Sequence, residues 1–201
     1  MQKNDNLDSK SHCVSCGVAT PGYDSVNFGS IEGGYRLLCT LCFNTEAAAK
    51  YGLDDFENIR FDQIVMADCA GAAHTFHFRT RLLGGTMVAL DAFELRDGEP
   101  AGYQFEIIGD PEDDLMALLG RLIERMRRRL SVKHIEQSKY GLQIVDKTVR
   151  AQISSDDTED ERVPLLEIDG QEVTWEEFGR MLMTFEGWQF RMEIADRSEE
   201  V

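Results

Sequence analysis

The sequence predicts an α+β fold: an N-terminal four-cysteine zinc finger, an antiparallel β-meander packed by one long helix, and a C-terminal β-hairpin–helix–strand unit. Three observations support this prediction. Two Cys-x2-Cys pairs lie near the N-terminus, at Cys13, Cys16, Cys39 and Cys42. Apolar and polar residues alternate over three stretches between residues 74 and 108. Apolar residues then recur at spacings of three and four between residues 115 and 130, as on one face of a helix.

Composition places the chain among folded soluble proteins. Of its 201 residues, 42% are hydrophobic and 29% are charged. No apolar run approaches the roughly 18 residues that cross a membrane, and the first residues are polar with no signal-peptide pattern. We therefore expect a cytoplasmic protein with no membrane partner. Paired cysteines in that compartment indicate metal or redox chemistry and not disulfides.

The two cysteine pairs predict one metal site. A two-residue gap lets both thiolates of a pair face the same ion, and two pairs complete a tetrahedral shell. Because a full shell of four thiolates leaves no position for a reacting water, we predict a structural zinc ion. Iron accepts the same ligands, and a thioredoxin-like redox pair at Cys39 and Cys42 is an alternative. His12, beside Cys13, is a possible substitute ligand.

Flanking residues extend the motif. Gly17 follows the first pair at a position suited to a tight turn, an apolar strand leads into Cys39, and residues 42–51 favour a helix that stops at Gly52. This order of knuckle, hairpin, knuckle and helix over residues 12–52 resembles a treble-clef zinc finger. Its spacing is similar in style to the zinc domain at the front of the ClpX chaperone. The resemblance implies a zinc ion and a role in dimerisation or adaptor binding. No nucleotide-binding P-loop follows, and the remainder resembles no characterised family.

The expected organisation has five parts. These are a disordered tail at 1–11, the finger at 12–52, the β-meander with its helix at 53–136, an acidic ββαβ-like unit at 137–196 that can share one core with the preceding part, and a tail at 197–201. In the last unit we expect one strand over 139–154, an acidic loop at 155–162 and an Asp169-Gly170 hairpin. A capping box at Thr174 and Glu177 then begins a helix, and a final strand turns Trp188, Phe190, Met192 and Ile194 inward.

A possible interaction patch lies in the central part. The first meander strand, residues 74–82, carries basic side chains on its predicted outer face, and the helix, predicted at 111–131 with its cap at Asp110, ends in a basic cluster. The patch comprises His77, Arg79, Arg81, Arg125, Arg127, Arg128 and Arg129. The helix end is either a solvated terminus whose cations complement the helix dipole or a docking surface for acidic groups.

Charge and motifs narrow the function. The net charge is −16, and residues 151–201 carry 4 Lys and Arg against 15 Asp and Glu, which disfavours nucleic acid as a partner. We expect a bacterial-type zinc-binding interaction or regulatory module with a protein partner or self-association. A nucleic-acid-associated protein using the basic face is the first alternative, and an enzyme or thiol redox protein is the second.

The sequence contains no catalytic signature motif, so we lean against an enzyme. Cys69, His77 and Arg79 are the nearest catalytic candidates. Cys69, His74 and His77 make a poor second metal site, because the two histidines point to opposite faces of a strand. We expect Cys69 to be a small buried residue.

Overall fold

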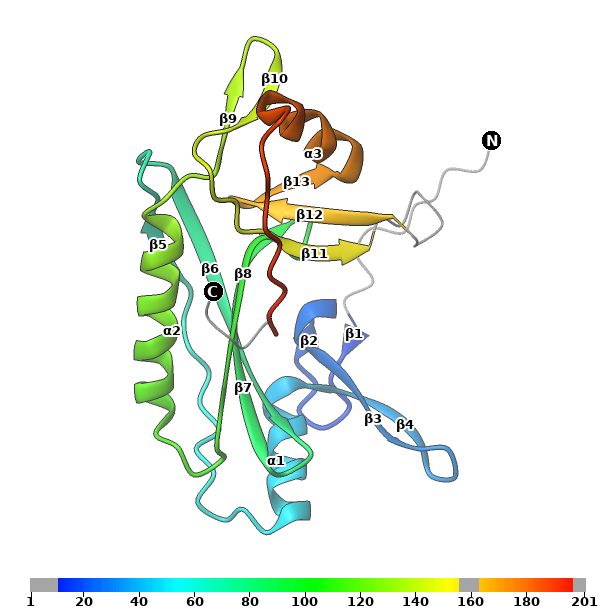
Figure 1. The fold of residues 1–201 in the computed structure, drawn as a ribbon. Helices are drawn as coiled ribbons and strands as arrows, with labels where there is room; N and C mark the ends of the chain where they lie inside the picture. The colour runs from blue at the N-terminus through cyan, green and yellow to red at the C-terminus, as the bar shows by residue number, and fades with distance from the viewer. Residues whose placement is uncertain (1–10, 156–162, 197–201) are drawn as a thin grey trace, which may run out of the picture.

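A computed structural model describes residues 11–155 and 163–196 of the chain. Residues 1–10 of the predicted N-terminal tail, the predicted C-terminal tail and residues 156–162 of the acidic loop lie outside these ranges, whereas Ser11 belongs to a short strand. A long central sheet has one helix on one side and the finger on the other, and a second β-rich unit sits at one end (Figure 1). Across the described ranges, the helices are all too short or too polar to span a membrane. The broad α+β prediction is confirmed.

The finger consists of two short hairpins followed by a helix. Its elements are β1 (Ser11–His12), β2 (Ala19–Thr20), the 3-10 turn η1 (Gly22–Asp24), β3 (Ser25–Ser30), β4 (Gly34–Cys39) and α1 (Thr40–Tyr51). β1 pairs with β2 and β3 pairs with β4, both antiparallel. Gly52 ends α1 in the left-handed region at φ 71°, as the sequence predicts.

The central sheet is an antiparallel meander in sequence order. Its strands are β5 (Ile64–Ala67), β6 (Ala73–Leu83), β7 (Met87–Arg96) and β8 (Glu99–Gly109). β6, β7 and β8 are the three predicted strands, and β5 is an additional edge strand. β5 covers β6 only as far as Phe76, and no other described strand pairs with the rest of that β6 edge.

Helix α2 (Leu115–Leu130) covers one face of this sheet (Figure 1). Its apolar stripe is buried against the strands, as predicted from its spacing. The stripe consists of Leu115, Leu118, Leu122, Met126 and Leu130. The predicted cap at Asp110 was wrong. Asp114 caps the helix instead, and its carboxylate accepts from the backbone N–H groups of Met116 and Ala117. Leu115, the first residue of the helix as it forms, is buried at 1% exposed, and the cap is the aspartate directly before it.

The C-terminal unit contains a two-stranded hairpin, a three-stranded sheet and a short helix. Its elements are β9 (Ile135–Ser138), β10 (Gly141–Ile144), β11 (Gln152–Ser155), β12 (Pro164–Ile168), β13 (Gln171–Thr174), α3 (Trp175–Leu182) and the 3-10 turn η2 (Met183–Phe185). The hairpin at Asp169 and Gly170 is confirmed, with φ values of 52° and 74° that suit a type I′ turn. The capping box at Thr174 and Glu177 is also present.

Two strand predictions in this unit were wrong. The expected strand over 139–154 begins in the turn that joins β9 to β10, and residues 145–151 then interrupt it, so that β10 pairs back to β9 and β11 is a separate strand. Residues 186–196 contain no strand, and the side chains of Trp188, Phe190, Met192 and Ile194 are exposed where burial was expected. The alternation predicted an extended segment with one buried face, and no neighbouring strand in the described chain supplies the cover.

Candidate metal centre

The four predicted cysteine ligands converge at one point. All four Sγ atoms lie within 4.8 Å of one another, and within the described residues this is the one group of three or more cysteine, histidine or acidic side chains that could hold an ion. The four thiols are free of disulfides. His12 is not a member of the group.

The sulfur spacing fits a metal better than a disulfide. Four sulfurs at a zinc–sulfur distance of about 2.3 Å stand about 3.8 Å apart along the edges of a tetrahedron. The Sγ atoms of Cys16 and Cys39 are 3.8 Å apart, whereas a disulfide needs about 2.05 Å. Four sulfur donors at this spacing match zinc and also iron. The donor set would fill all four coordination positions of the ion.

The first pair lies in a tight knuckle. The N–H of Gly17 donates to the carbonyl of Cys13 at 2.8 Å, and the N–H of Cys13 donates to the carbonyl of Val18 at 3.0 Å. Gly17 adopts φ 73°, so the predicted need for glycine is confirmed. A bond from Val14 N–H to the Leu37 carbonyl, 3.0 Å long, fixes this knuckle against the strand that delivers the second pair.

The second pair lies at the start of a helix. Cys39 ends β4 and is the N-cap residue of α1, and Cys42 lies in the first helical turn. The backbone N–H groups and the dipole at a helix start favour thiolates, but burial outweighs this effect at Cys39 and Cys42 and raises their pKa values. Burial of Cys13 and Cys39, at 1% and 4% exposed, shields the centre on one side, while Cys16 is exposed on the other.

The thiols differ in their acidity. Burial raises the pKa of Cys13, but hydrogen bonds from backbone groups of Cys16, Cys39 and Ser15 outweigh it and lower this pKa to about 6. Burial raises the pKa of Cys39, and burial together with the neighbouring Cys39 thiol raises the pKa of Cys42 to about 12. Without an ion, the cluster therefore holds one readily formed thiolate beside thiols that keep their protons at neutral pH.

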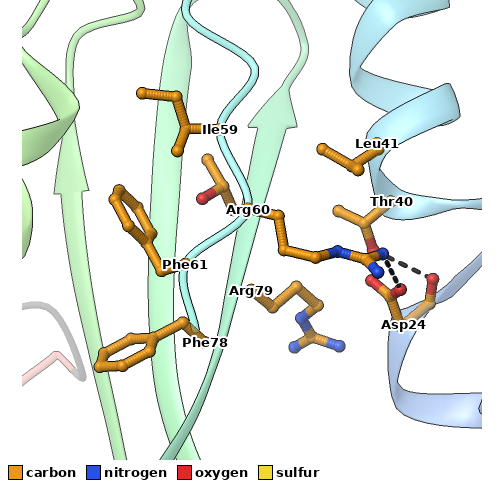
Figure 2. A pocket seen from close by; sticks show the side chains of 9 residues that line it. Asp24, Thr40, Leu41, Ile59, Arg60, Phe61, Phe78 and Arg79 are labelled. Atoms are coloured by element: carbon orange, nitrogen blue, oxygen red, sulfur yellow. Dashed lines mark hydrogen bonds and ion pairs between the residues drawn. The ribbon is translucent and has the colours of Figure 1, made fainter. Parts of the chain in front are cut away.

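Polar contacts join the finger to the central sheet and the segment before it. Asn44 of α1 is fully buried, donates to the Thr80 carbonyl at 2.8 Å and accepts from the Leu82 N–H at 2.9 Å. Figure 2 shows a second connection, in which the Arg60 guanidinium lies 2.8 Å from the Asp24 carboxylate. Thr40, next to Cys39, donates to the Asp24 carbonyl at 3.1 Å. The metal centre is therefore supported by contacts that reach β6.

The β6 part of the possible interaction patch is engaged within the chain. The Asp91 carboxylate, which is 2% exposed, accepts hydrogen bonds from Arg79 Nε at 2.9 Å and from Arg81 Nε at 3.0 Å. Arg79 also donates to the Tyr23 carbonyl at 2.6 Å. His77 is half-buried beside Tyr23 and Phe93. The face predicted to be a basic outer face is thus partly covered by the finger.

The α2 part of the patch is more accessible. Arg127 and Arg128 are exposed, and Arg127 lies 3.4 Å from Glu124. Arg125 donates to the Glu106 carbonyl at 2.7 Å, and burial lowers the pKa of Arg129. The role of this group as a partner surface stays a prediction.

The candidate catalytic residues do not form a site. Cys69 is exposed, contrary to the expected burial, because the turn after β5 points Asp68 inward and leaves Cys69 outside. His77 lines a shallow hollow of about 210 Å³ beside the finger, and Arg79 lines an adjoining space of about 20 Å³, which is room for one water molecule (Figure 2). With Arg79 held by Asp91 and Tyr23, these residues offer no paired nucleophile and base.

One buried cluster was not found by sequence reasoning. Asp68 accepts from the backbone N–H groups of Ala70 and Ala72 at 2.9 and 2.8 Å, and its other oxygen lies 2.8 Å from Lys133 Nζ. The Lys133 ammonium holds the pKa of this carboxyl well below its usual range despite burial. His74 stands 3.5 Å from Asp68 and 2.9 Å from Glu94. The cluster connects the β5–β6 turn to the chain after α2. The sequence feature that could have indicated it is Asp68, an acidic residue directly after the apolar strand β5.

Comparison with known families divides the chain into three matched parts. Each matched model is described as a domain of unknown function: DUF7685 over residues 12–54, DUF7686 over 57–131 and DUF7713 over 134–199. All four clustered cysteines fall within the first match. No curated protein and no solved structure matches the chain.

Proposed function

We propose that this chain is a zinc-binding protein-interaction or regulatory module whose four-cysteine site is structural. The observation that carries the proposal is the convergence of four free thiols within 4.8 Å of one another, with the Cys16 and Cys39 sulfurs at the 3.8 Å expected of a tetrahedral site. Zinc is favoured over iron because the site continues directly into a hairpin and helix in the order of a treble-clef finger, similar in style to the ClpX zinc domain. Reduced thiols suit a reducing compartment such as the cytoplasm.

A structural role follows from the donor set. Four thiolates fill the tetrahedral shell, whereas catalytic zinc keeps one position for water or substrate. The ion would hold two knuckles that are 22 residues apart in sequence, and the contacts of Asn44 would transmit that order to β6. A structural ion at this place supports a surface for another protein and supplies no hydrolytic chemistry. Nucleic acid is the weaker partner class, because Asp91 engages Arg79 and Arg81.

Zinc content and thiol reactivity test the proposal together. We expect about one zinc per chain in protein purified without added metal, as two cysteine pairs at one ion require. Exposed Cys69 should react quickly with a thiol reagent, and all five cysteines should react after unfolding with a chelator. Cys42→Ser should lower zinc content, and Cys69→Ser is the matched control that should retain it. Metal-free protein with a reversible disulfide would contradict the proposal and indicate a redox protein.

A further inference from the structure

The segment that follows η2 presents large apolar side chains to solvent. The exposed fractions are 63% for Trp188, 75% for Phe190, 58% for Met192 and 74% for Ile194. These residues alternate with Gln189, Arg191 and Glu193, which is the pattern of a strand with one buried face. Clustered apolar exposure of this kind marks an interaction surface in a soluble protein.

The backbone of the segment is open as well. The Trp188 N–H donates to the Phe185 carbonyl at 2.9 Å, and beyond it no backbone group of residues 189–195 bonds to another described segment. The start of the segment is held in place, because the Trp188 ring packs edge-on against Phe185 and lies 5.4 Å from Lys147 Nζ. An unpaired extended backbone with this alternation can add another strand.

We propose that two copies of this chain associate by pairing their residues 190–194 antiparallel, around a two-fold axis at Met192. In an antiparallel pair, residues directly opposite each other lie on the same face. Matching apolar with apolar side chains therefore requires the axis to pass through a residue and not between two residues. This leaves a small set of registers.

Charge selects among those registers. An axis at Arg191 or at Glu193 would place two like charges directly opposite each other, which is destabilising. An axis at Phe190 would place Arg191 opposite Gln189 and form no ion pair. With the axis at Met192, Arg191 faces Glu193 of the second copy on both sides, and Phe190 faces Ile194 of the second copy. The segment is therefore complementary to itself in one register, as a closed two-fold interface requires.

Two local features support this arrangement. Arg191 and Glu193 already project to the same side, with Nη2 and Oε2 3.2 Å apart, and both are well exposed. A two-stranded ribbon is only marginally stable alone, so its apolar face needs cover. The same unit exposes three more apolar side chains, those of Val145, Ile153 and Met183.

The inference rests on the proposed function only for the class of partner, since self-association is one form of protein interaction. The metal site is a separate matter, because the pairing residues and the cysteines belong to different parts of the chain. Zinc content and association state are therefore independent readouts.

A charge-reversal series in the full chain tests the register. Sedimentation velocity across a range of concentrations should show a dimer for the unsubstituted chain. Arg191→Glu and Glu193→Arg should each weaken association roughly ten- to a hundredfold, since each replaces two cross-strand attractions by two repulsions. The double variant Arg191→Glu/Glu193→Arg should return to within about threefold. Arg180→Glu, a charge reversal on the exposed side of α3, should change nothing.

The outcomes separate the two proposals. A monomer that contains one zinc per chain overturns the pairing and leaves the proposed function intact, whereas a metal-free dimer does the reverse. A dimer that ignores the single reversals, or that the double reversal does not restore, also overturns the pairing.

Cross-linking gives a second readout that does not depend on charge. In a Cys69→Ser background, Met192→Cys should form a covalent dimer rapidly with diamide as oxidant, because the residue at a two-fold axis faces its own copy. Gln189→Cys should cross-link slowly. Equal rates for the two variants would contradict the axis at Met192.

Discussion

The Asn44 side chain hydrogen-bonds to backbone groups at the part of the β6 edge where no described strand pairs. β5 pairs with β6 only up to Phe76, and beyond that point the edge of β6 faces the finger. The side-chain amide bonds to two backbone groups there: it donates to the Thr80 carbonyl at 2.8 Å and accepts from the Leu82 N–H at 2.9 Å. One fully buried amide therefore connects the four-cysteine finger to the sheet.

Replacing Asn44 with alanine should reduce stability strongly. The substitution leaves a carbonyl and an N–H buried without partners, and each such group costs about 1 to 3 kcal/mol. The free energy of unfolding should fall by about 2 to 6 kcal/mol, against a typical total of about 5 to 15 kcal/mol. Urea unfolding of the zinc-loaded protein, followed by circular dichroism, measures the change.

Two further variants sharpen this test. Asn44→Asp retains an acceptor for the Leu82 N–H but cannot donate to the Thr80 carbonyl, so it should also destabilise the protein. Asn27→Ala, on the exposed side of β3, should change the free energy of unfolding by less than about 0.5 kcal/mol. A loss below about 1 kcal/mol for Asn44→Ala would refute the argument that this amide holds the β6 edge.

Three other predictions concern charge, metal and a turn. Burial raises the pKa of Asp91, but its two arginine partners lower it more. The ionised carboxylate therefore stabilises the fold at pH values above the unfolded-state pKa near 4, and this stabilisation is lost as pH falls through the lowered folded-state pKa. Asp91→Asn should lose up to about 3 kcal/mol at pH 7 and show a weaker fall in stability from pH 5 to pH 2; an unchanged acid profile would contradict this. Zinc must displace the protons of Cys39 and Cys42, because burial raises the pKa values of these thiols. The zinc Kd, measured by chelator competition, should therefore rise by about a hundredfold or more for each unit by which the pH is lowered. A pH-independent Kd would exclude thiolate ligation. Gly170→Ala should lower the urea midpoint, because φ is 74° and the added methyl carbon would lie 2.9 Å from the Tyr103 ring, and an unaltered midpoint would show that the turn relaxes freely.

Features governed by short-range chemistry were predictable from the sequence. The spacing of the two cysteine pairs indicated their convergence, Gly52 and the Asp169-Gly170 turn took the expected left-handed conformations, and the capping box at Thr174 formed. The stripe of α2 was also correct, because its spacing fixes which helix face is apolar and the central sheet packs against that face. Each of these features involves residues that are close in sequence or a repeat with a fixed period.

Features that depend on distant segments were not predictable in the same way. The alternation of residues 74–82 indicated a polar face but not that the finger would cover part of it or that buried Asp91 would engage Arg79 and Arg81. An aspartate inside the apolar run of β7 was the available signal. Likewise, the alternation at 188–194 indicated an extended segment, yet a strand also needs a neighbour, and no local pattern says whether one exists.

The central claim is that a zinc ion held by the four cysteines stabilises the fold, and zinc release measured during urea unfolding tests it most directly. Zinc release, detected with a chromogenic chelator, and loss of secondary structure, detected by circular dichroism, should share one urea midpoint, because the ion and the sheet are joined through the finger. Stripping the metal beforehand should lower that midpoint. A zinc-free protein with the same midpoint as the original, or a chain that never contained zinc, would contradict the account.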